Sequence, residues 1–102
     1  RTRREADRRT SLAMSELVNS FGIAVRQLRD RQGWSQEDLA GRADLNRSYV
    51  GELERGKAIP SLLTVEKIAG ALGISTTSLL THAERIAQTR LVRGLELTAI
   101  AC

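Results

Sequence analysis

Helix-capping residues recur at short intervals along the middle of the chain, and their spacing limits what the chain can fold into. Ser35 precedes Asp38 by three residues, the spacing of a capping box in which two side chains bond free amides at a helix start. Asn46, Ser61 and Ser75 stand before three further apolar segments of helical period. The sequence therefore predicts a series of short helices rather than a sheet.

Five helices follow from these caps and from the residues that end each segment. In chain order they are a helix from about Ser15 to Gln32, a second from the Ser35 cap to about Ala43, a third from Arg47 to about Arg55, a fourth between Ser61 and Gly73, and a fifth after Ser75. The short connections predict one all-α domain over residues 14–88. Residues 89–102 fit a helix extension, a strand that pairs with a partner, or a tail.

Composition narrows the possible functions of the 102-residue chain. Cys102 and His82 are the only residues of their types, which leaves little for a disulfide framework, a zinc site or His-based catalysis. A phosphate-cradling glycine loop is also absent, so we expect no enzyme, no cofactor, no metal and no small-molecule ligand. We expect a cytoplasmic protein without membrane contact, because neither a membrane-length apolar run nor a secretory signal pattern is present.

Positive charge is concentrated at the beginning of the sequence. The net charge is +4, of which residues 1–13 contribute +3 through five arginines and two acidic residues. The remainder is nearly neutral, so bulk charge is weak evidence for a nucleic-acid partner. Because Met14 opens onto a periodic helix, residues 1–13 are interpreted either as a vector-derived or variable extension, or as a basic arm that contacts phosphates.

A very short turn joins the second and third expected helices. Asp44 can adopt the left-handed backbone that a tight turn needs, and Ala40 is small where the two helices must cross closely. Leu39, Val50 and Leu53 supply apolar contacts between them. Two short helices packed near a right angle across such a turn form a helix-turn-helix.

Residues 26–73 resemble the Cro and lambda-repressor-like helix-turn-helix family, also called the XRE family. The resemblance is carried by Arg26-Gln27-Leu28-Arg29, Gly33-Trp34-Ser35-Gln36-Glu37-Asp38-Leu39-Ala40, Leu53-Glu54-Arg55-Gly56-Lys57 and the apolar pattern between Leu62 and Gly73. It implies a five-helix lambda-repressor-like domain that regulates transcription by binding double-stranded DNA at specific sequences. The stretch Asn46–Gly56 is also similar to the controller proteins of restriction–modification systems. Phage-type repressors and antitoxins share much of the pattern, and a protein-interaction module without DNA binding is the remaining alternative.

The third helix is the expected reading element, because residues near the start of such a helix meet base edges in the major groove. Arg47 and Ser48 directly follow the Asn46 cap, and Glu52 lies one turn beyond Ser48 on the same face. Arginine can bind guanine through two hydrogen bonds, and glutamate can accept one from cytosine. Tyr49 suits a thymine methyl group or a phosphate. We therefore predict DNA contacts from all five residues.

Further roles are implied by the family resemblance. Ser35, Gln36 and Lys57 match positions that contact the DNA backbone, which sets register and affinity without reading sequence. Arg29 and Glu54 match a partly buried ion pair between the first and third helices, so Glu54 is not expected to read bases. Gly51 is interpreted either as a point of close approach to DNA or as a tolerated small residue.

A homodimer is expected because one helix reads only a few base pairs. Two symmetric copies would bind a near-palindromic operator with half-sites separated by roughly 34–36 Å. Leu79, Leu80 and Ile86 of the fifth helix are the candidate interface, since they add apolar surface beyond what a four-helix core requires.

Overall fold

The computed structural model describes the backbone of residues 3–101 and the side chains of residues 16–94. Within that part the chain is all-α, and its elements run in the order α1 (Arg3–Gln32), α2 (Gln36–Ala43), α3 (Arg47–Glu54), α4 (Leu62–Leu72) and α5 (Thr76–Ala101). The expected fold class of five helices is confirmed.

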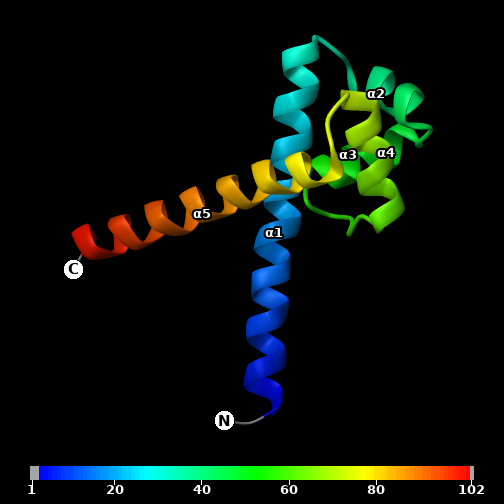
Figure 1. Ribbon diagram of the computed structural model, residues 1–102. Helices are drawn as coiled ribbons and strands as arrows, with labels where there is room; N and C mark the ends of the chain where they lie inside the picture. The colour runs from blue at the N-terminus through cyan, green and yellow to red at the C-terminus, as the bar shows by residue number, and fades with distance from the viewer. Residues whose placement is uncertain (1–2, 102) are drawn as a thin grey trace.

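Two long helices, α1 and α5, cross where the first part of α5 passes α1, and α2, α3 and α4 gather beside the C-terminal half of α1 (Figure 1). The core fills the space between these three short helices, that half of α1 and the first part of α5. Its largest fully buried apolar side chains are Val25, Leu39, Val50, Leu53, Ile68 and Leu79. All five helices therefore contribute to one core, which holds α2 and α3 in a fixed position.

The outer ends of α1 and α5 differ from the expectation. Helix α1 begins at Arg3 rather than near Ser15, and α5 continues to Ala101, which selects the helix extension among the three alternatives for residues 89–102. Apolar periodicity marks only a buried helical face, so it is a poor guide where a helix leaves the core. Residues 3–14 and 89–101 contain no proline, and most of their residues are good helix formers.

The capping residues act as the sequence predicts. The Ser35 hydroxyl accepts a bond from the Asp38 amide at 3.0 Å, and the Asp38 carboxylate accepts one from the Ser35 amide at 2.9 Å. The pKa of Asp38 lies below its usual value, mainly because of the bond from the Ser35 backbone amide. The side chains of Asn46, Ser61 and Ser75 each accept a bond from a backbone amide at the start of the next helix, without the reciprocal bond of the capping box.

One expectation about α5 is wrong. Leu79 is fully buried within the chain's own core, so it is not available to an interface with a second copy. Leu79 shares a face with Ala83, one turn later, and that face packs against the rest of the domain. Leu80 and Ile86 pack against the edge of the same core and are half-buried.

A glycine in α1 permits the closest packing between helices. A Cβ atom at Gly22 would overlap the carbonyl oxygen of Leu53 and would lie 2.9 Å from the carbonyl oxygen of Glu54. The backbone of α1 therefore sits directly against the C-terminal end of α3. The periodic pattern gave no signal for this contact, because Gly22 lies inside a helix and needs no unusual backbone angle.

Replacement of Gly22 by alanine tests this packing. We expect Gly22→Ala to lower the free energy of unfolding by about 1–3 kcal/mol, because the added methyl group forces the two backbones apart. The matched control is Gly70→Ala in α4, where nothing lies within 4 Å of the added atom. That variant should be neutral or more stable by up to ~1 kcal/mol. Urea unfolding at one protein concentration measures both values, and equal stability of the two variants would contradict the proposed contact.

Candidate nucleic-acid interface

A tight turn sets the angle between α2 and α3. Asp44 adopts the expected left-handed conformation, with φ 54° and ψ 52°, and the Leu45 amide donates to the Ala40 carbonyl at 2.8 Å. Lys67 of α4 donates to the Asp44 carbonyl at 3.3 Å and lies 3.7 Å from its carboxylate. The turn is therefore fixed both by its own backbone and by a side chain from α4.

Helix α3 presents one apolar and one polar face. Val50, Gly51 and Leu53 are buried against the domain. The expected base readers Arg47, Ser48 and Glu52 are exposed, and their side chains have no hydrogen-bond or ion-pair partner among the described side chains. At the helix start, the Asn46 side chain accepts from the Ser48 amide at 2.8 Å.

Tyr49 lies between the two faces and is half-buried. Its hydroxyl oxygen is 3.3 Å from the hydroxyl oxygen of Thr64 in α4, and Thr64 in turn is 3.0 Å from the Ser61 hydroxyl. Part of this side chain therefore fastens α3 to the start of α4. The remaining exposed part of the ring is what Tyr49 can offer to a ligand.

A buried ionic network joins α1, α2 and α3. Arg29 donates from Nε to Oε2 of Glu54 at 2.7 Å and from Nη2 to Oε1 at 2.9 Å, and its Nη1 donates to the Trp34 carbonyl at 2.8 Å. Only 11% of the Arg29 side chain and 3% of the Glu54 side chain are exposed. The hydrogen bond to Glu54 raises the pKa of Arg29 further above its ordinary value. The ion pair implied by the family resemblance is present.

Gln36, the first residue of α2, joins this network. Its Nε2 donates to Oε1 of Glu54 at 3.0 Å, so Glu54 sets the orientation of the Gln36 amide. Ser35 has both its hydroxyl oxygen and its amide engaged in the capping box. Ser35 and Gln36, two of the three residues expected to contact the DNA backbone, therefore already form hydrogen bonds within the domain.

Gly51 was interpreted either as a point of close approach to DNA or as a tolerated small residue, and the structure places the protein's own side chains next to it. The residue is buried, and a Cβ atom there would lie 3.2 Å from Nη1 of Arg55 and 3.5 Å from Oε1 of Gln36. The protein's own side chains fill this space. Arg55 was not among the expected contact residues, although its spacing of four residues from Gly51 places it on the same helical stripe.

Lys57 follows the left-handed Gly56 and is exposed. Its backbone amide donates to the Glu52 carbonyl at 2.9 Å, which ties the segment after α3 to the helix end. The Lys57 side chain takes part in no ion pair within residues 16–94. Its ammonium group is therefore presented at the C-terminal end of α3.

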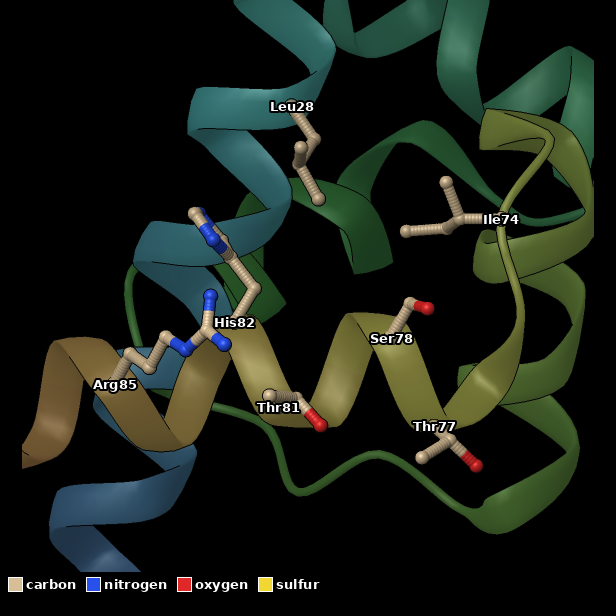
Figure 2. Close-up of a pocket in the computed structure, with 7 residues that line it drawn as sticks. All are labelled: Leu28, Ile74, Thr77, Ser78, Thr81, His82 and Arg85. Atoms are coloured by element: carbon tan, nitrogen blue, oxygen red, sulfur yellow. The ribbon is translucent and has the colours of Figure 1, made fainter.

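An open pocket of about 340 Å³ lies elsewhere, between α1, the segment before α5, and α5 itself (Figure 2). Leu28 and Ile74 contribute its apolar side, and His82 turns toward α1, where Nε2 lies 2.9 Å from Oε1 of Gln27. The pocket is built from different residues than the exposed face of α3. No cluster of three metal-ligating side chains occurs among the described residues, and no helix there is long and apolar enough to cross a membrane.

Two short helices fixed across a tight turn, with the second exposing a polar face, define a helix-turn-helix domain. The family model for helix-turn-helix proteins, HTH_3, matches residues 25–79, more than half of the chain. The chain belongs to this family, as its resemblance to the XRE-type proteins indicated.

Control proteins of restriction–modification systems are among its similar proteins. Control protein C.BamHI of Bacillus amyloliquefaciens is 46% identical over 61 residues, which are 59% of this chain and 75% of that protein. The crystal structure of the controller protein C.AhdI from Aeromonas hydrophila is 48% identical, with a TM-score of 0.59 over 62% of this chain and 94% of that one. C.Esp1396I, whose structure is a tetramer in complex with its natural 35-base-pair operator, is 24% identical to this chain. The match has a TM-score of 0.65 and covers 71% of this chain and 95% of that one. This likeness shows a shared fold.

The buried ion pair generates a prediction about stability. We expect Arg29→Ala to lower the free energy of unfolding by about 3–5 kcal/mol, because it leaves the Glu54 carboxylate buried without its cation. Arg26→Ala on the same helix is the control, since Arg26 forms only an exposed pair with Asp30 and should cost less than ~1 kcal/mol. Thermal and urea unfolding measure both effects. Similar losses from the two substitutions would show that the buried pair has no special role.

Proposed function

We propose that this chain is a sequence-specific regulator of transcription that binds double-stranded DNA in the cytoplasm and has no enzymatic activity. The observation that carries the proposal is the exposed face of α3, where Arg47, Ser48 and Glu52 are unpartnered within the described chain while the opposite face is locked into the core. A rigid helix whose polar groups are unsatisfied is suited to read base edges. Membership of the helix-turn-helix family supports the same function.

Base reading is assigned to the first turns of α3. Arg47 can bind guanine O6 and N7, a pair worth ~1–3 kcal/mol of discrimination against other bases. Glu52 can accept from a cytosine amino group, and the Ser48 hydroxyl can pair with several bases. Asn46 keeps its amide nitrogen for a contact while its oxygen caps the helix, and the exposed edge of Tyr49 can meet a thymine methyl or a phosphate.

Phosphate contacts are assigned to Ser35, Gln36 and Lys57, which flank α3 on two sides. Gln36 gives one N–H of its amide to Glu54 and retains the second for a phosphate oxygen. Lys57 adds an unpaired positive charge after the helix. These contacts would fix the register of α3 on the duplex without reading sequence.

The active form is proposed to be a homodimer on a near-palindromic operator, because a single α3 covers too few base pairs for useful specificity. With Leu79 excluded by its burial, the proposed interface consists of Leu80 and Ile86 together with the later part of α5, where Leu91 and Val92 are exposed. The identities of 46% with C.BamHI and 48% with C.AhdI favour a restriction–modification controller.

Selection of bound sites from random duplexes tests the proposed function. We expect enrichment of a near-palindromic sequence, with two half-sites whose centres are about 10 base pairs apart or a multiple of that spacing. Fluorescence anisotropy on the enriched duplex should then show an affinity that falls steeply with salt, because phosphate contacts release counterions. A wild-type chain that enriches no sequence and binds no duplex is not the regulator proposed.

Two substitutions should separate base reading from phosphate contact. Arg47→Ala is expected to reduce the preference for the enriched duplex over an unrelated one by about 5–150-fold, the equivalent of ~1–3 kcal/mol. Lys57→Ala should weaken both duplexes by a similar factor and lower the salt slope by about 1. Arg26→Ala serves as the control, because Arg26 is an exposed arginine of α1 that belongs neither to the proposed contacts nor to the proposed interface. If Arg47→Ala leaves the preference unchanged, the base-reading assignment is wrong.

A further inference from the structure

Arg55 ends α3 and its side chain runs back along the helix it follows. The residue forms the C-cap of α3, with φ −88° and ψ 0°. Its Nη1 reaches the empty position above Gly51, one turn earlier, within 3.2 Å of where a Cβ atom would stand. A glycine weakens the interior of a helix relative to alanine, so its presence at this point calls for a packing reason. The guanidinium group of Arg55, which occupies the space next to Gly51, is such a packing reason.

The positive charge of Arg55 has no carboxylate to neutralise it within residues 16–94. The adjacent Glu54 is turned inward and is bound by Arg29 through two hydrogen bonds. Some cations of the described chain have carboxylate partners, such as Lys67 with Asp44 and Arg90 with Glu16, whereas Arg55 shares its lack of an ion pair with Arg47 and Lys57. Arg55 is exposed, and its guanidinium group lies close to Gly51. It therefore offers a positioned cation next to the exposed face of α3.

Gln36 faces the same point from α2. Because its Nε2 donates to Glu54, its Oε1 is directed toward Gly51 and lies 3.5 Å from the position of the missing Cβ atom. Arg55 and Gln36 thus converge over Gly51 from different helices. Glu54, which is paired with Arg29, orients Gln36, and the lack of a side chain at Gly51 leaves room for the Arg55 guanidinium group.

We propose that Arg55 binds a DNA phosphate and that Gly51 is a positioning residue that allows it to do so. The inference rests on the proposed function, and it adds a contact that the helix-turn-helix motif alone did not identify. A phosphate is favoured over a base because Arg55 lies at the C-terminal end of α3, whereas base edges are met by residues near the start of such a helix. Arg55 and Gln36 would then both contact the DNA backbone beside the major groove that Arg47 enters.

The test uses the full chain and two labelled duplexes, the site enriched from the random pool and a scrambled duplex of the same composition. We expect Arg55→Ala to weaken binding to both by about tenfold at low salt and to reduce the salt slope by about 1. Arg55→Lys should restore most of the slope because it keeps the charge. Gly51→Ala should weaken binding while its thermal stability stays the same or rises, since alanine favours the helix.

A double-mutant cycle decides whether Gly51 acts through Arg55. If it does, Gly51→Ala weakens the wild type but has little further effect on Arg55→Ala. Equal losses in both backgrounds would overturn the positioning role. Unchanged affinity and slope for Arg55→Ala would overturn the phosphate contact, as would a loss confined to the enriched duplex, which would indicate base reading. A wild-type chain that binds neither duplex would instead reject the proposed function itself.

Discussion

The ion pair between Arg29 and Glu54 is the interaction on which the geometry of α3 depends. It lies where α1, α2 and α3 meet, with Glu54 almost wholly buried and bonded to both Arg29 and Gln36. A buried charge without a partner there would lower the stability of the fold, so Arg29 and Glu54 must stay paired in one geometry. Beside this pair, Gly22 allows the backbone of α1 to touch the end of α3. Together they hold the C-terminal end of the helix while the Asn46 cap and the Asp44 turn hold its start.

Most of the helix boundaries and turns could be predicted from interactions between residues close in the sequence. The capping box at Ser35, the Asn46 cap and the left-handed Asp44 depend on residues within a few positions of one another, and the structure contains all three. Contacts between residues far apart in the sequence were harder to predict. Leu79 satisfies the pattern of an apolar helical face, but whether that face meets its own core or a second copy depends on how α5 crosses α1. A periodic pattern indicates that a face is covered without indicating by what.

In the candidate DNA-binding site, too, some features follow from the sequence and one requires the three-dimensional structure. Exposure of Arg47, Ser48 and Glu52 follows from helical period once Val50 and Leu53 are placed in the core. The side-chain arrangement over Gly51 does not follow, because it requires Gln36 of α2 and Arg55 after α3 to meet at one point. Glycine at position 51 was a visible irregularity in a helix, and it was interpreted either as a point of close approach to DNA or as a tolerated small residue. Neither interpretation included the side chains of Gln36 and Arg55, which only the three-dimensional arrangement of α2 and α3 brings to Gly51.

The central claim is that α3 enters the major groove with Arg47 directed at base edges. Protection of guanine N7 from methylation by dimethyl sulfate, measured on the enriched duplex, tests it most directly because N7 lies in that groove. We expect protected guanines in both half-sites, with one symmetric pair of protections lost in Arg47→Ala and the others retained. Saturating binding without any protected N7, or with a pattern identical in Arg47→Ala, would contradict it.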